Sequence, residues 1–599
     1  MFAVRFLAVA VAAVAVGVAP AADEKPAIPA GNYALSYSPN PSFEQRFLIV
    51  KIGEKDGKPT AELVSSPPRA GDVTVGKLTV ENGKVTLPVN LGSNKLSFEG
   101  VLDAKEPKTV LGSFGDDARI FRAALTATDL EKLGQDNMNV PVKMPEGFQE
   151  YQKLAGKAMQ LKFRARQTKD ADEKKKLLDE AEAAAKEADE KGPDLLKAVV
   201  KDHPGTLASA NAALELVKTA ARIKASPDDA TAWGKEVLGF AAKHGSRYSN
   251  QTLAALAEAY LGQKGFEANA LPFAEIAAKD EAAPPARRIR ALKALATAQE
   301  KGGAADAAKK TLVILEEMEA KLDDEYNQKV PPYKPEKFKG RKDEKANRVA
   351  VVELFTGAQC PPCVAADVGF DGLLKAYDSK DVVLLQYHMH IPGPDPLTNP
   401  TSIARWEFYG EKHPGKIRGT PTTLFNGTPN AGGGGGMDNA EKKFEQYRGL
   451  IDPLLEEKSP ITLDGAAMKD GDAVTATVSV TGLKDPAASV KVRFLLVEEN
   501  VRYVGGNGVR FHHHLVRSQF DLPDGVPVKK LDDGKYTAKL DLAATKKKLA
   551  DYLADFAKDQ PFPSAERPLA LKGLKVVVLV QDDDSGEILQ AMQLPVVGG

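Results

Sequence analysis

The sequence of 599 residues contains two cysteines, and they stand three positions apart as Cys360 and Cys363. Two thiols at this spacing can form a disulfide together and exchange it with another disulfide through a mixed-disulfide intermediate. A zinc site needs four ligands, and no further cysteine is present. Covalent haem attachment needs a histidine directly after the second cysteine, where Val364 stands. We therefore expect redox chemistry without a metal or cofactor, and the alternative is a purely structural disulfide.

The residues around the cysteines predict elements that position them. Residues 349–355 form a near-continuous apolar run, which is typical of a strand buried on both faces. Apolar residues at helical spacing follow Cys363, and residues 382–385 form a second buried strand. A thiol at a helix N-terminus meets the positive end of the helix dipole, which favours the thiolate. We therefore expect Cys360 to attack and Cys363 to resolve the mixed disulfide.

This order of strand, Cys-x-x-Cys, helix and strand resembles the thioredoxin fold, here over residues 348–458. A second signature of that family follows downstream: Gly419, Thr420, Pro421 and Thr422. The resemblance implies that the Thr420-Pro421 peptide bond is cis and faces the disulfide. It also implies that Thr420 offers its backbone to an extended substrate chain and that Pro421 shapes the groove. The helix that closes such a fold is expected over residues 439–450, before Pro453.

Two positions depart from the family pattern. Gln359 stands where thioredoxins usually have tryptophan. The family's buried acid in the preceding strand has its nearest match in Glu353, one residue further from the cysteine than expected. Glu353 would assist proton transfer to the resolving thiol only if the loop before Cys360 carries one extra residue. Otherwise it is an edge or exposed residue without a catalytic role.

The two prolines between the cysteines bear on the redox potential. If Cys360 caps the helix, Pro361 and Pro362 occupy its first two positions, where prolines are tolerated. Pro362 has no N–H to donate to the thiolate, so we expect a potential nearer the thioredoxin value of about −270 mV than the oxidising value of about −120 mV. Because Pro361 itself precedes a proline, its bias away from helical ψ would start the helix later.

The first 22 residues indicate export. A single Arg5 precedes an apolar run over residues 6–18, and small residues at 19–21 match a signal-peptidase site. The apolar run of 13 residues is shorter than the ~20 that a membrane span needs. We expect a cleaved signal peptide, no membrane span afterwards, and a periplasmic or secreted protein.

The pattern along the chain predicts a multidomain protein. We expect an all-β domain, an all-α domain with a weak internal repeat, a basic linker rich in proline and lysine, the α/β thioredoxin-fold domain and a β-sandwich-like domain; their ranges are 23–130, 145–326, 327–347, 348–458 and 459–599. The Asn82-Gly83 pair predicts a β-hairpin turn. The α domain is either a solenoid of helix pairs or an irregular bundle.

Other motifs leave alternatives open. An insertion over residues 386–418 holds three of the histidines and is offered as a substrate lid. His512 and His514 would share one face of a strand, so they could hold a metal ion together. Residues 432–436 are all glycine and predict a floppy hairpin tip. The formal net charge of −1 gives no reason to expect nucleic acid as a partner.

The sequence therefore predicts an exported thiol-disulfide oxidoreductase that acts on protein or peptide disulfides, in the reductase or isomerase direction. Such an enzyme needs an external electron donor or acceptor, since no electron carrier is fused to the chain. The alternative is a non-catalytic binding or scaffold protein that keeps the thioredoxin fold only as a platform. The intact Cys360, Cys363 and Pro421 favour the enzyme.

Overall fold

The computed structural model describes residues 28–598, which divide into two compact units between Lys321 and Leu322. Not described within that span are residues 41–42, 69–70, 93, 104, 117–118, 169, 521–523 and 531–533. The boundary between the units falls within helix α8 (Ala305–Lys329). The predicted signal peptide lies outside the described residues. Across the described part of the chain, no helix combines the length and apolar character of a membrane span.

The N-terminal region is all-β, as predicted. Its strands are β1 (Gly31–Asn40), β2 (Phe43–Lys55), β3 (Lys58–Ser65), β4 (Val73–Val75), β5 (Thr79–Glu81), β6 (Lys84–Leu91), β7 (Asn94–Leu102), β8 (Thr109–Gly115), β9 (Ile120–Ala127) and β10 (Asn139–Pro141). They form one antiparallel sheet in the order β10-β2-β1-β9-β8-β7-β6-β4, with β3 beside β2 and β5 beside β6. Asn82 and Gly83 join β5 to β6 with φ of 51° and 77°, which confirms the predicted hairpin.

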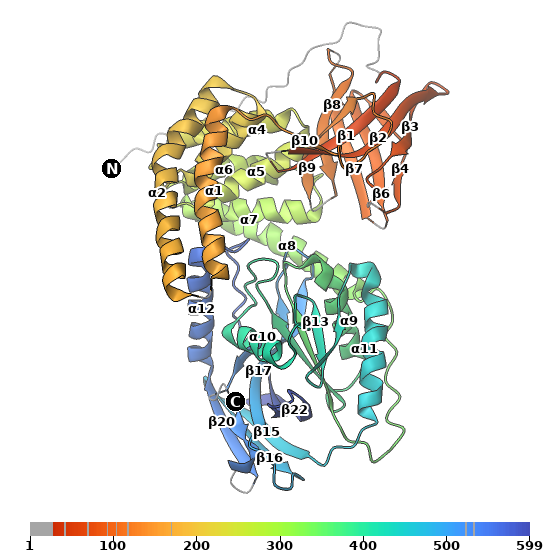
Figure 1. Cartoon of the computed structure of the whole chain (residues 1–599), viewed down its shortest axis with the longest axis vertical. Helices are drawn as coiled ribbons and strands as arrows, with labels where there is room; N and C mark the ends of the chain where they lie inside the picture. Colours follow the sequence, from red (N-terminus) through yellow and green to blue (C-terminus); the bar gives the residue numbers. More distant parts are fainter. Residues whose placement is uncertain are drawn as a thin grey trace. The chain divides into compact units, whose positions relative to one another are not determined.

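A helical region follows in the same unit. Its helices are α1 (Glu146–Gln167), α2 (Ala171–Asp202), α3 (Leu207–Thr219), α4 (Pro227–Ala242), α5 (Ser246–Leu261), α6 (Glu267–Ala278), α7 (Pro285–Lys301) and α8. Leu253, Leu256 and Tyr260, whose spacing predicted a helix, are buried in α5. Helices α1 and α2 run side by side (Figure 1), and α5 packs on α3 as well as on α7. The predicted all-α region is therefore present.

The second unit begins with alternating strands and helices. They are β11 (Ala350–Thr356), α9 (Val364–Ala376), β12 (Val382–His388), α10 (Pro400–Lys412), β13 (Thr422–Phe425), β14 (Thr428–Gly432) and α11 (Ala440–Leu455). The sheet order is β14-β13-β11-β12, with β11 parallel to β12 and antiparallel to β13. All residues of β11 and β12 are buried because both faces are covered. Helices α9 and α11 lie together on one face, and α10 covers the other (Figure 1).

The C-terminal region is β-rich and continues this sheet. Its elements are β15 (Thr462–Asp470), β16 (Ala473–Thr481), β17 (Val490–Arg502), β18 (Phe511–Gln519), β19 (Val526–Pro527), β20 (Lys535–Asp541), α12 (Leu542–Asp559), β21 (Leu574–Asp582) and β22 (Ile588–Gly598). Strand β18 joins β12 where Leu515 lies opposite Gln386, and the order then runs β17-β21-β22-β15-β16-β20. The β17–β18 hairpin therefore reaches the end of the sheet that carries the cysteines.

Two segments differ from the sequence predictions. Helix α11 continues to Leu455, so the prediction that it ends before Pro453 is wrong. Pro453 stands in the last turn, where its missing N–H removes a hydrogen bond only near the helix end. After Lys329, the basic segment has no helix or strand, yet Tyr333 and Phe338 pack against the core beneath α9 and α11. It is therefore attached to the second unit rather than freely solvated.

Candidate active site

Strand β11 brings the two cysteines to one end of the sheet. Cys360 has an extended backbone, with φ −100° and ψ 102°, and Pro361–Cys363 form a single 3-10 turn. The α-helix proper begins at Val364, with Cys363 as its N-cap. Cys360 is the N-cap of this 3-10 turn, and the α-helix begins later, as expected because a residue that precedes proline disfavours helical backbone and Pro361 precedes Pro362. Cys360 therefore stands one turn before the α-helix.

Cys360 and Cys363 form a disulfide with an S–S distance of 2.04 Å and a Cα–Cα distance of 5.3 Å. The pairing expected from their spacing is thus present. Cys363 N–H donates to the Cys360 carbonyl oxygen at 3.1 Å, which closes the turn. The disulfide is not open to solvent, since Cys360 is 1% and Cys363 0% exposed.

The Thr420-Pro421 segment, 60 residues downstream, faces the disulfide. The peptide bond between these residues is cis, as the resemblance implied. The Thr420 carbonyl oxygen lies 3.7 Å from Cys360 Sγ. The Thr420 hydroxyl lies 3.5 Å from the same sulfur and 3.3 Å from the Ile391 carbonyl oxygen. The structure therefore brings together four of the predicted site residues: Cys360, Cys363, Thr420 and Pro421.

Glu353 lies elsewhere, on the sheet face that α10 covers. Its carboxylate accepts from Arg405 Nε at 2.8 Å, from Tyr387 at 3.1 Å and from the Tyr409 hydroxyl. Although burial alone would lower the pKa of Arg405, the charge of Glu353 raises it above the ordinary value. The residue is 0% exposed, so it is neither an edge nor a surface glutamate. None of its hydrogen bonds reaches a cysteine, so the geometry lends its predicted part in proton transfer no support.

Asp367 is the buried carboxyl on the same side as the cysteines, and the sequence analysis missed it. It lies four residues after Cys363 in continuous helical backbone, which puts the two Cβ atoms about 5–6 Å apart. Gln386 Nε2 donates to Oδ1 at 3.2 Å, whereas the buried Oδ2 has no hydrogen-bond partner. Burial, with the nearby carboxylates of Asp371 and Asp395, raises the pKa of Asp367 well above its ordinary value. The spacing Cys-x-x-x-Asp is the sequence signal that could have identified it.

A buried His388–Asp395 pair holds the loop that precedes Cys360. Asp395 Oδ2 lies 2.8 Å from His388 Nδ1 and accepts from the Ala358 N–H at 2.6 Å. Burial would raise the pKa of Asp395, but the interactions with His388 and with backbone N–H groups outweigh it and lower the pKa. His388 Nε2 lies 3.3 Å from Gln386 Oε1. A chain of polar contacts thus runs from Asp367 through Gln386 and His388 to the loop before Cys360.

The insertion offered as a lid packs on the sheet instead. Its helix α10 buries Tyr409 and half-buries Trp406 against the strands, so it forms part of the core. His390 stacks on Phe556 with a centroid distance of 3.6 Å, and burial lowers its pKa to about 4. His413 Nε2 lies 2.8 Å from the Gly427 carbonyl oxygen. These histidines have structural partners.

The histidines of β18 point to different surroundings. His512 is fully buried with Nε2 3.0 Å from the Tyr503 carbonyl oxygen, and burial lowers its pKa to about 3. His514 has φ of 53°, so the alternation of side chains breaks here. His513 and His514 therefore line one cavity, of about 440 Å³, which does not include His512. In the described part of the chain, no group of three or more His, Cys, Asp or Glu residues is placed to hold a metal ion.

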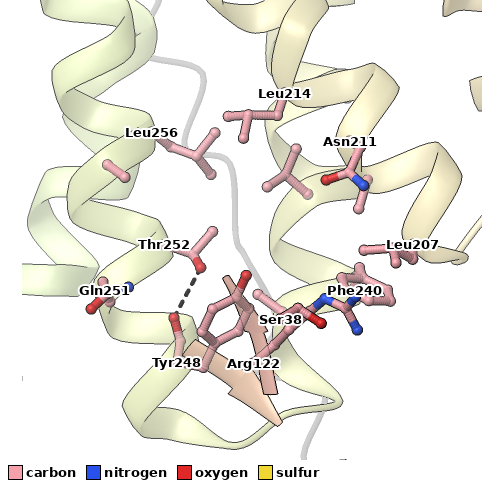
Figure 2. Close-up of a pocket in the computed structure, with 14 residues that line it drawn as sticks. Ser38, Arg122, Leu207, Asn211, Leu214, Phe240, Tyr248, Gln251, Thr252 and Leu256 are labelled. Atoms are coloured by element: carbon pink, nitrogen blue, oxygen red, sulfur yellow. Dashed lines mark hydrogen bonds between the residues drawn. The ribbon is translucent and has the colours of Figure 1, made fainter. Parts of the chain in front are cut away.

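A separate cavity of about 250 Å³ lies within the first unit (Figure 2). Arg122 of β9, Asn211 of α3 and Tyr248 of α5 line it together with apolar side chains that include Leu256. Arg122 Nη1 pairs with Glu44 at 3.0 Å. Its lining contains neither cysteine nor histidine, so it offers no redox chemistry.

Comparison with known proteins gives little further guidance. No family model matches the chain, and no curated protein matches it. Among solved structures, HBP35 of Porphyromonas gingivalis is 15% identical with a TM-score of 0.30, covering 42% of this chain and 76% of that one. The protein AGR_C_4864 from Agrobacterium tumefaciens is 19% identical with a TM-score of 0.27, covering 41% of this chain and 95% of that one. Neither similarity is large enough to support an argument about fold or function.

Proposed function

We propose that the protein is a thiol-disulfide oxidoreductase and that residues 348–458 are a thioredoxin-like domain. The observation that carries the proposal is the Cys360–Cys363 disulfide at the start of α9 with the Thr420 carbonyl 3.7 Å from Cys360 Sγ. A sheet in the order β14-β13-β11-β12, with helices on both faces, supports the same assignment. A merely structural disulfide would have no need of a second, distant loop facing its sulfur.

In the reductase direction, the Cys360 thiolate attacks one sulfur of a substrate disulfide. The substrate S–S bond breaks, a mixed disulfide forms, and the first substrate sulfur leaves as a thiolate that takes up a proton. Cys363 then loses its proton and attacks Cys360 Sγ, which releases the second substrate sulfur. Two electrons have passed to the substrate, and Cys360 and Cys363 are joined again. An external dithiol donor must reduce them before the next cycle.

We assign to Asp367 the role of exchanging a proton with the Cys363 thiol. It is buried one helical turn from Cys363, and its Oδ2 has no hydrogen-bond partner. A carboxyl with a raised pKa is a stronger base and lies closer to the pKa of a thiol, so proton transfer is less uphill in either direction. Glu353 is fully engaged by Arg405 on the other face and is not assigned this role.

The redox potential should stay near the reducing end of the family range. Pro362 offers no N–H, and α9 begins only at Val364, so Cys360 lies one turn from the helix end whose dipole would stabilise its thiolate. The proposed direction is therefore reductase or isomerase. The composition of residues 1–22 supports export to a periplasm or beyond, with protein or peptide disulfides as substrates.

Two serine substitutions test the proposal. Cys363→Ser should trap a mixed disulfide between Cys360 and a substrate, because only the second thiol can release it. Cys360→Ser should trap nothing and should abolish reduction of insulin, although it retains Cys363. Mass spectrometry of non-reduced samples measures the adduct. If neither variant traps an adduct and the wild type is inert, the binding-protein alternative holds.

A further inference from the structure

The all-glycine run of residues 432–436 contacts the turn that carries the cysteines. Gly435 N–H donates to the Pro362 carbonyl oxygen at 2.7 Å, and Ala365 N–H donates to the Gly435 carbonyl oxygen at 3.0 Å. Gly435 thus pairs through its backbone with residues on both sides of Cys363. The prediction of a floppy hairpin tip is wrong for this part of the run, because its peptide groups complete hydrogen bonds that the helix N-terminus leaves open.

Gly434 can approach the disulfide because it has no side chain. A Cβ atom at this position would lie 1.8 Å from the Pro362 carbonyl oxygen and 2.8 Å from Pro421 Cγ. Gly434 therefore lies between the two prolines that flank the disulfide. A Cβ atom on Gly432 would meet nothing within 4 Å, and its φ lies outside the left-handed region. Only one of these two glycines is thus required by close packing.

The β17–β18 hairpin approaches from the residues that precede Cys360. Gly506 N–H donates to Gln359 Oε1 at 3.1 Å, and Asn507 N–H donates to the Ala358 carbonyl oxygen at 3.1 Å. The Asn507 side chain adds a hydrogen bond to the Gly357 carbonyl oxygen at 3.2 Å. The hairpin and the glycine run lie beside the segment that carries the cysteines, where Cys360 has almost no exposed surface.

The β17–β18 hairpin and the glycine run differ in how firmly they are attached to the segment that carries the cysteines. The hairpin joins two paired strands of the sheet and uses a side chain as well as its backbone. Residues 434–435 have no side chains to bury, and two backbone hydrogen bonds connect them to the cysteine turn. A segment with few buried apolar contacts opens at lower free energy than the core. Of these two segments, the glycine run is therefore the one that an incoming substrate can displace.

We propose that residues 434–435 occupy the docking position of an extended substrate polypeptide, which displaces them and takes over their two hydrogen bonds. This inference rests on the proposed thiol-disulfide exchange and names its substrate class. The Pro362 carbonyl oxygen accepts a hydrogen bond from the Gly435 N–H, and the Ala365 N–H donates one to the Gly435 carbonyl oxygen. Any extended chain can supply the same pair of groups whatever its side chains are. A disulfide on a folded protein surface cannot enter, because Cys360 is recessed.

Two glycine substitutions test the proposal in the full-length, reduced protein. The probes are an unstructured peptide with one disulfide and bis(2-hydroxyethyl) disulfide, which has no peptide groups. Gly434→Ala should lower the half-saturating peptide concentration at least fivefold, because the added methyl group moves the competing segment away. The rate with bis(2-hydroxyethyl) disulfide should change less than twofold, and Gly432→Ala should match the wild type with both probes.

Equal gains with both probes would mean that the run only shields the disulfide, and no gain with either would mean that it does not compete; both results overturn the inference. Exchange by the wild type with neither probe would instead contradict the proposed function. If Gly434→Ala does not fold, amide hydrogen exchange in the wild type decides. The probe is the same peptide with its cysteines replaced by serine. Its binding should deprotect the Gly435 amide, which loses its acceptor. The Ala365 amide should stay protected, because a carbonyl of the peptide replaces that of Gly435. Any other pattern at these two amides overturns the inference.

Discussion

Two buried carboxyl groups on opposite faces of the β11–β12 sheet have different surroundings. Glu353 receives hydrogen bonds from both ends of the Arg405 guanidinium and from two tyrosine hydroxyls, all within the core beneath α10. Asp367, on the face of α9, receives one hydrogen bond from Gln386 and has an oxygen without a partner. Both are almost completely buried, so burial alone does not distinguish them.

The two faces therefore differ in how completely a buried carboxyl is paired. Glu353 stands beside a permanent cation and receives hydrogen bonds on both oxygens, which is the arrangement of a structural buried ion pair. Burial raises the pKa of Asp367, which favours its protonated form, and Asp367 lies one helical turn from Cys363, whose thiol must gain and lose a proton in the exchange that we propose. We therefore base the proposed role of Asp367 on its incomplete pairing rather than on its burial.

The largest expected effect comes from breaking the completed side. Arg405→Leu would leave Glu353 buried without its cation, which should reduce the free energy of unfolding by about 3–5 kcal/mol. Tyr387→Phe, which removes one donor at 3.1 Å, should cost only about 1 kcal/mol. Urea unfolding measures both. A loss below about 1 kcal/mol for Arg405→Leu would show that this cluster is not a structural ion pair.

Lowering the pH should reduce the free energy of unfolding through the other face of the sheet, where His512 lies against His388. Because burial lowers the pKa of His512 to about 3 from 6.5, its contribution to stability is complete above pH 6.5 and is lost as the pH falls toward 3. The loss from this residue is on the order of 3 kcal/mol at pH 4. Urea unfolding of His512→Gln at pH 8 and pH 4 should show a correspondingly smaller acid loss than the wild type. An identical pH dependence in both proteins would mean that His512 is already charged.

Asp367→Asn should separate chemistry from stability. The folded-state pKa of Asp367 lies above 3.8, its ordinary value. Its carboxyl therefore does not reduce the free energy of unfolding below about pH 4, and it destabilises the fold as the pH rises. The variant should therefore be more stable than the wild type at pH 8 and equal to it near pH 4. Release of the mixed disulfide should slow roughly 100-fold at pH 7.

Asp371→Asn is the matched control for this substitution. It lies one further turn along α9 and pairs with His513 at 2.8 Å. Stopped-flow measurement of mixed-disulfide release across pH 5–9 should show the slowing only in Asp367→Asn. An equal slowing in both variants would mean that loss of negative charge along α9, rather than proton transfer, causes the effect.

The sequence alone was sufficient to predict the elements that neighbouring residues encode. The apolar run of β11, the cysteine turn, α9 and the Thr420-Pro421 segment are each recognisable within a few residues. Glu353 shares its alternation with Val351 and Phe355, but nothing local says that α10 rather than α9 covers that face. The error therefore came from the packing of distant elements, which alternation alone does not reveal.

Long-range pairing also decided the remaining features of the site. Asp367 looks like an ordinary helical acid until β12 and α9 bury it, and its partner Gln386 lies 19 residues away. The C-terminal strands read as a separate domain, yet the β17–β18 hairpin contacts the loop of Gln359, 147 residues earlier. The glycine run predicted flexibility because no side chain marks its contact with Pro362. Such contacts depend on the backbone of the whole second unit.

An equilibrium titration of Cys360 and Cys363 against glutathione tests the central claim most directly. The account predicts one reversible two-electron transition near −270 mV, because Pro362 gives the thiolate no N–H and α9 starts one turn too late to stabilise it strongly. A potential above about −150 mV would contradict the reductase or isomerase direction. A disulfide that stays oxidised throughout the glutathione range while the fold is intact would contradict thiol-disulfide exchange itself.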